Sequence, residues 1–182
     1  MVLPIILEPN KILHQVGRDL NLEEIKSNKI QKLIIDMIPT MYAKDGVGLA
    51  APQVGESIQL CVIAKNYTPD QKKDLVLINP KWQKTSVFRE WDEEGCLSVP
   101  ETYGQVRRYK KIKVEALDET GKKINFVAEN FFARIIQHEV DHLNGILFIE
   151  KAKNIRHENP LELWLTPSIL APTNSRPRFW NI

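Results

Sequence analysis

The segment His138–Glu–Val–Asp–His142 constrains the fold of this chain more than any other part of the sequence. Two histidines four positions apart share one face of an α-helix, so both imidazoles can reach one metal ion. Apolar residues recur at helical spacing before the motif and predict a helix over 129–143. Glu139 adjoins the histidines and is suited to be a general base. We therefore expect the rest of the chain to pack around this helix.

A catalytic metal site usually has three protein ligands and one open position, so a third ligand must come from elsewhere. Phe148 stands where one class of zinc proteases carries a third histidine, and phenylalanine cannot bind a metal. Glu162 stands where another class supplies a glutamate, but no helical pattern surrounds it. Cys96 lies in a segment that predicts a bend, and a thiolate binds zinc or iron well. A nucleophilic cysteine–histidine pair is a further alternative, which would leave Glu139 without a role.

The remaining patterns predict one more helix and several strands. Apolar residues spaced by three and four predict a helix over 23–42, with Pro39 disturbing its last turn. The glycine-rich segment 46–55 predicts a loop that approaches another group closely. Strands are expected at 59–64, 75–78, 84–90, 112–117 and 123–128, and Asp118–Gly121 is expected to form a hairpin turn between the last two. Strands followed by one late helix predict an α+β fold.

Composition restricts the class of protein. The chain has 182 residues, which suits one domain, and its formal net charge of +2 gives no reason to expect specific nucleic-acid binding. The basic run 107–111 is expected at a solvated strand edge, with a contact to ribosomal RNA or an acidic peptide terminus as the alternative. Cys61 is expected as a small buried residue. No apolar stretch is long enough for a membrane span and no signal peptide is visible. We expect a protein of the bacterial-type cytoplasm that has no membrane partner; an organellar or virus-encoded origin stays open.

Three segments together resemble the signature motifs of the peptide deformylases. They are Gly46–Val–Gly–Leu–Ala–Ala–Pro–Gln53, Glu94–Gly–Cys–Leu–Ser98 and Gln137–His–Glu–Val–Asp–His142. The resemblance covers about residues 1–152 and implies a catalytic domain of that extent. Its fold would be the α+β fold of that family, with antiparallel or mixed sheets packed around the metal-binding helix. Residues 153–182 are rich in proline, and we expect a C-terminal extension without a long helix.

The resemblance also implies a role for individual residues. Cys96, His138 and His142 would bind one divalent metal ion, and Glu139 would be the general base. The side chain of Gln53 and the backbone N–H of Leu97 would stabilise an oxyanion. Contacts with the substrate are expected from six residues: Val47, Gly48, Glu94, Gly95, Phe131 and Ile135.

The activity implied is removal of the formyl group from the N-terminal formylmethionine of newly synthesised polypeptides, with release of formate. Iron(II) is the expected native ion, and zinc, nickel or cobalt could replace it in purified protein. The expected partners are formylmethionyl nascent peptides and, transiently, the ribosome.

Overall fold

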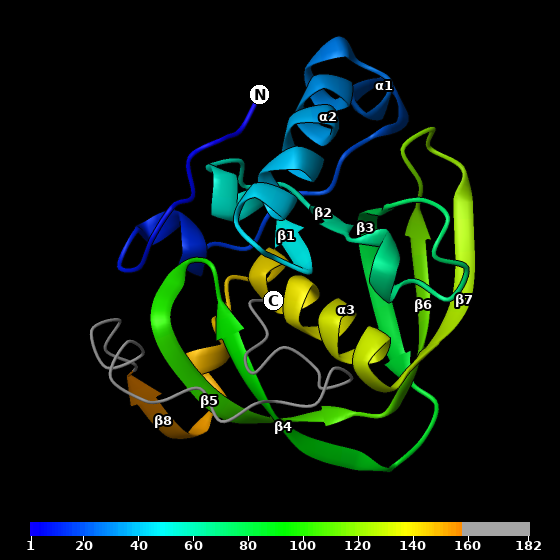
Figure 1. Cartoon of the computed structure of the whole chain (residues 1–182). Coiled ribbons are helices and arrows are strands. Elements are labelled where there is room, and N and C mark those ends of the chain that lie inside the picture. Colours follow the sequence, from blue (N-terminus) through cyan, green and yellow to red (C-terminus); the bar gives the residue numbers. More distant parts are fainter. Residues whose placement is uncertain (158–182) are drawn as a thin grey trace.

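A computed structural model describes residues 1–157 of the chain (Figure 1). Helix α3 (Asn130–Leu143) lies between two antiparallel sheets and contacts strands of both. This arrangement confirms the expected α+β fold. The expectations for 158–182, including any role of Glu162, lie outside the described residues. The proposed domain boundary at residue 152 stays a prediction.

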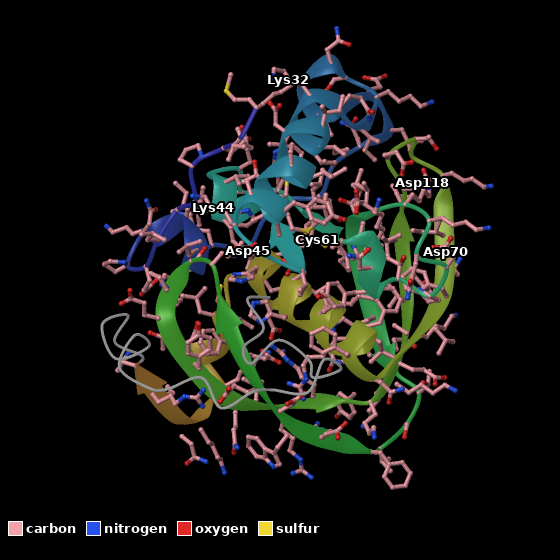
Figure 2. The ribbon with its side chains drawn as sticks, in the orientation of Figure 1. Lys32, Lys44, Asp45, Cys61, Asp70 and Asp118 are labelled. Carbon is pink, nitrogen blue, oxygen red and sulfur yellow. The ribbon has the colours of Figure 1, made fainter. Side chains whose placement is uncertain are left out.

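The larger sheet has the strand order β1-β2-β3-β6-β7. Its strands are β1 (Gly48–Ala50), β2 (Leu60–Ile63), β3 (Leu75–Lys84), β6 (Lys111–Leu117) and β7 (Lys123–Glu129). In β6, buried and exposed residues alternate, so that one face of the strand contributes to the core. The expected hairpin between β6 and β7 is confirmed. Asp118 (labelled in Figure 2) holds its turn by accepting hydrogen bonds from the backbone N–H groups of Thr120 and Lys122.

The smaller sheet has the order β4-β5-β8. It consists of β4 (Arg89–Cys96), β5 (Val99–Tyr109) and β8 (Lys153–His157). The sequence did not predict this sheet, and the strand expected at 84–90 was wrong, since β3 ends at Lys84 and β4 begins at Arg89. Most half-buried strands are recognised by apolar residues at every second position. In β4 the inward positions carry acidic side chains instead, so this pattern is missing.

The expected N-terminal helix is divided into two. Helix α1 (Leu22–Ile25) is short, and α2 (Asn28–Ala43) begins after Ser27, whose hydroxyl accepts a hydrogen bond from the Ile30 N–H. Helix α2 runs through Pro39, and its apolar face packs on β1 and β2. Single-turn 3₁₀ helices complete the described chain: η1 (Lys11–His14), η2 (Ala51–Val54), η3 (Lys65–Tyr67) and η4 (Phe148–Glu150).

The glycine-rich segment 46–55 is more regular than the expected loop. It forms the edge strand β1 and then η2, which together bring the backbone onto α3. Cys61 (Figure 2) is fully buried on β2, as expected. Among the described residues, no helix is both long and apolar enough to cross a membrane.

Candidate metal centre

Three buried side chains converge between α3 and the end of β4. Cys96 Sγ lies 3.2 Å from His142 Nε2, which lies 3.1 Å from His138 Nε2. All three potential ligand atoms lie within 4.8 Å of one another. Helix α3 presents both histidines on one face, and β4 ends with the cysteine directed at them. The structure thus brings together the three residues that the sequence suggested as metal ligands.

The donor set fits one divalent cation. In a tetrahedral site with metal–nitrogen distances of about 2.0 Å and metal–sulfur distances of about 2.3 Å, neighbouring ligand atoms are separated by about 3.3–3.6 Å. The observed separations of 3.1 and 3.2 Å are close to this.

Both carboxylate oxygens of Glu139 are buried beside the cluster without a hydrogen-bond partner among the described residues. A buried carboxylate without a partner is costly, so the site needs a further polar or charged group.

Burial shifts the pKa values of the cluster toward neutral forms. It raises the pKa of the Cys96 thiol to about 12 and the pKa of Glu139 well above its ordinary value. It also lowers the pKa of His142 well below its ordinary value, and the neighbouring His138 adds to this effect. A bound cation acts in the opposite direction on a thiol, because it stabilises the thiolate. The protein surroundings therefore favour a neutral imidazole, and a metal ion would favour the thiolate.

A buried ionic network orients one of the two histidines. Glu94 is fully buried and accepts a hydrogen bond from His138 Nδ1 at 3.0 Å. Arg108 donates two hydrogen bonds to the same carboxylate, at 2.9 and 2.8 Å, and Arg134 donates a third at 2.6 Å. Arg108 also donates to Asp141 on α3. With its Nδ1–H bonded to Glu94, the imidazole directs the lone pair of Nε2 at the cluster.

Glu94 stays ionised in this network. Burial by itself would raise its pKa, but the charge of Arg108 and the hydrogen bonds from His138 and Arg108 outweigh burial and hold the pKa well below its ordinary value. The sequence suggested that Glu94 contacts the substrate, and the structure directs its side chain inward. The expectation of a solvated basic run was wrong for Arg108, which is 5% exposed. Arg107 beside it is exposed.

Gln53 and Leu97 flank the cysteine. Gln53 lies on η2 and is buried; its Oε1 accepts a hydrogen bond from the Ala50 N–H at 2.8 Å. This hydrogen bond leaves the NH₂ group of the Gln53 side chain directed at the metal cluster, with Nε2 at 3.5 Å from Cys96 Sγ. Leu97 directly follows Cys96, but the backbone groups that hydrogen-bond the Cys96 thiol are those of Ser98 and Val99. Gln53 thus provides one neutral hydrogen-bond donor at the edge of the cluster, and the role expected for the Leu97 N–H stays a prediction.

Gly48 is in contact with the carboxylate of Glu139. A Cβ atom at this position would lie 2.1 Å from Glu139 Oε1 and 2.7 Å from Cδ. Only glycine lets β1 pass this close to the carboxylate. The structure thus explains one glycine of the segment 46–55 by its proximity to Glu139.

The other residues expected to contact a substrate differ in their surroundings. Ile135 is fully buried in the core and Val47 is 5% exposed. Gly95 pairs with Tyr103 across the β4–β5 ladder. Phe131 is half-buried, contacts the Tyr67 ring edge to face at 5.6 Å, and lines a cavity of about 240 Å³. Phe131 is thus the one of these four whose side chain lines a described cavity.

No sequence pattern pointed to Arg108 and Asp141 as supports of the site. The cavity beside Phe131 is lined by seven further residues, most of them charged or polar: Glu90, Asp92, Arg108, Tyr109, Lys110, Asn130 and Arg134. Charged residues at every second position of β4 were the signal that could have revealed this side of the site.

Comparison with known proteins gives consistent results. The family model described as polypeptide deformylase matches residues 2–158. The chain is 45% identical over 155 residues to the peptide deformylase of Symbiobacterium thermophilum, covering 85% of this chain and 69% of that protein. It is 43% identical over 158 residues to the peptide deformylase of Syntrophomonas wolfei, covering 86% and 97%.

Solved structures show the same similarity. The class I type b peptide deformylase of Acinetobacter baumannii with bound Met-Ala-Ser is 39% identical, with a TM-score of 0.77 and coverage of 83% of this chain and 98% of that chain. The peptide deformylase of Thermotoga maritima is 35% identical, with a TM-score of 0.77 and coverage of 84% and 99%.

Proposed function

Because the chain belongs to the polypeptide deformylase family, we propose that Cys96, His138 and His142 hold one divalent metal ion and that Glu139 transfers the proton. The reaction removes the formyl group from an N-terminal formylmethionine and releases formate. The observation that carries the assignment of residues is the buried Cys–His–His cluster beside a carboxylate without a partner.

The chain's own residues divide the chemistry among them. A bound ion would lower the pKa of a coordinated water and polarise the formyl oxygen. Glu139, whose pKa is raised by burial, can accept a proton from the attacking water and return it to the departing amine. The Gln53 amide and the Leu97 N–H can donate hydrogen bonds to the oxygen on which negative charge develops. Glu94 keeps the His138 ring in place throughout.

We propose iron(II) as the native ion. One thiolate and two imidazoles suit iron(II), cobalt, nickel and zinc, and the choice among them depends on metal supply as well as on geometry. A ferrous site with a thiolate ligand is sensitive to oxygen. Purification in air should therefore lower activity or exchange the ion.

The proposed substrate is an extended formylmethionyl peptide. The edge strand β1 at Gly48 and the backbone at Gly95 can pair with such a chain, and Phe131 with Val47 can contact the methionine. This agrees with the tripeptide in the structure of the Acinetobacter protein. We further propose that the protein acts on nascent chains in the cytoplasm, with transient contact with the ribosome.

Formate release from a short formylmethionyl peptide tests the proposal. Protein loaded with iron(II) under anaerobic conditions should release formate, and Cys96→Ser should lose bound metal and activity together, because a hydroxyl is a poor replacement for a thiolate ligand. Glu162→Gln should retain both. Metal content and formate are measured on the same samples. Full metal content in Cys96→Ser with loss in Glu162→Gln would assign the third ligand to Glu162, and a metal-loaded parent without formate release would refute the activity.

Gly48→Ala should lower kcat/KM by about 100-fold while the metal stays bound. The new methyl group must displace the Glu139 carboxylate or β1, and a displacement of about 1 Å is enough for an effect of this size. Gly55→Ala is the control, because a Cβ atom there comes no closer than 3.9 Å to another group, although its positive φ costs some stability. Equal kcat/KM for Gly48→Ala and the parent would show that the contact with Glu139 is unimportant.

A further inference from the structure

The outer face of the β4–β5–β8 sheet, together with the adjoining end of β3, carries a strip of basic and aromatic side chains. We define this outer strip by six residues: Lys84, Arg89, Trp91, Arg107, Tyr109 and Lys153. Tyr109 has Lys84 Nζ at 5.8 Å and the Arg89 guanidinium at 4.1 Å from its ring centroid. Trp91 lies opposite Arg107 in the ladder and has Lys153 Nζ at 5.2 Å from its ring. The metal cluster and its supporting network use none of these side chains.

Charge is segregated on this strip. It holds four basic residues and no acidic one, whereas the whole chain has a formal net charge of only +2. Arg107 is exposed and has no ion pair or side-chain hydrogen bond among the described residues. The acidic residue that follows on this face of β4, Glu93, is paired with Arg156 at 2.8 Å. The strip therefore attracts a polyanion although the chain as a whole is almost neutral.

The aromatic residues add a stacking surface to this charge. Trp91 is 41% exposed, and Phe88 in the turn before β4 is 72% exposed. Along β4, Trp91 lies two residues from Arg89, which is the ladder partner of Tyr109. The positions of Trp91 and Tyr109 are therefore separated by a rise of about 7 Å along the strands. Flat sheets that present aromatic rings beside arginines and lysines suit single-stranded nucleic acid, because bases stack on the rings and phosphates contact the cations.

A membrane fits the strip less well. Anchoring at a lipid surface needs apolar side chains gathered on one side of a basic border. Among the described residues of this sheet and the turn before it, the exposed aliphatic or phenyl side chains are the scattered Val87, Phe88 and Ile155. Trp91 and Tyr109 each have a cation from another strand beside the ring.

We propose that the outer strip binds single-stranded RNA without sequence specificity, through phosphates on the basic residues and base stacking on Trp91. The proposal agrees with the prediction that the chain has no specific nucleic-acid partner. It does not depend on the deformylase activity. It gives the enzyme a second surface, separate from the metal cluster, for association with RNA at the place where its substrates are made.

Binding of the full-length, metal-loaded protein to a labelled single-stranded RNA of about 12 nucleotides tests the proposal by fluorescence anisotropy. With three to four phosphates neutralised, the logarithm of the association constant should fall with the logarithm of salt concentration with a slope of about −2 to −3. Arg107→Ala combined with Lys153→Ala should bind at least about tenfold more weakly at low salt and reduce the slope by about 1.4. Trp91→Ala should weaken binding about tenfold without changing the slope, and Trp91→Phe should restore most of it.

Matched controls separate the strip from a general effect of charge. Lys26→Ala combined with Lys122→Ala removes the same charge from exposed positions outside the strip and should bind RNA nearly as the parent does, with the same slope. All variants should release formate at the parental rate, which also shows that they are folded. Absence of saturable RNA binding at low salt, or equal losses in both double variants, would overturn the proposal. Binding to phosphatidylglycerol vesicles without binding to RNA would overturn it too and assign the strip to membranes.

Discussion

Glu139→Gln should lower kcat for formate release by about two to four orders of magnitude while metal content stays at the parental level. Glutamine has nearly the same shape as glutamate but cannot accept the proton, and general acid–base catalysis contributes an effect of this size. The buried carboxylate has no partner among the described residues that could take over its role. Metal should be retained because the cluster of Cys96, His138 and His142 does not include this side chain.

The control for this experiment lies directly before the same helix. Glu129, the residue before α3, has a side chain that is 54% exposed and is paired with Lys111. Glu129→Gln makes the same chemical change at the surface and should leave kcat unchanged. If Glu139→Gln retained kcat within about threefold of the parent, with full metal occupancy, Glu139 would not be the base.

Glu94→Gln should destabilise the protein by about 3–5 kcal/mol and weaken metal binding about 10- to 100-fold. The substitution removes the buried carboxylate charge that Arg108 and Arg134 share; these residues are 5% and 4% exposed. Asp141 still pairs with Arg108 and compensates part of the charge. The substitution also changes the hydrogen bond that holds the His138 ring. Urea unfolding of the metal-loaded protein measures stability, and competition with a chelator measures affinity.

The neighbouring residue provides a matched control for Glu94. The carboxylate of Glu93 pairs with Arg156 at the surface, so Glu93→Gln should cost less than about 1 kcal/mol of stability and leave metal affinity unchanged.

The pH dependence of stability gives a second test of the role of Glu94. Because the pKa of Glu94 is lowered by folding, its stabilisation is full above its unfolded value of about 4.3 and is lost as pH falls toward the folded value. The difference between parent and Glu94→Gln should therefore shrink only in acid. Equal stability at neutral pH would contradict the account of the network.

Local patterns made parts of the fold predictable. The helix expected over 129–143 agrees with α3 to within one residue, and the β6–β7 hairpin was correctly placed. In both, an apolar periodicity and a turn signal agree, and such elements are the easiest to recognise. The ligand set was harder to establish, because Cys96 and His142 are 46 residues apart and only the fold brings the end of β4 beside α3.

The supporting network could not be found in this way. Charged residues such as Glu94, Arg108 and Arg134 are seldom fully buried. Here they are buried because their charges compensate one another, with Asp141 also paired to Arg108. Sequence patterns judge each residue by its own polarity. They therefore do not detect charged residues that can be buried only when they neutralise one another. For the same reason β4 and β5 escaped the strand analysis.

The alternation along β5 restricts how this protein can diversify. From Thr102 to Arg108, buried and less buried side chains succeed one another at each step, so that adjacent arginines face opposite sides of the sheet. A gain or loss of one residue inside this stretch would exchange the two sides: Arg107 would enter the interior and the partner of Glu94 would turn to solvent. We expect descendants of this sequence to change the length of β5 only in steps of two or at its ends.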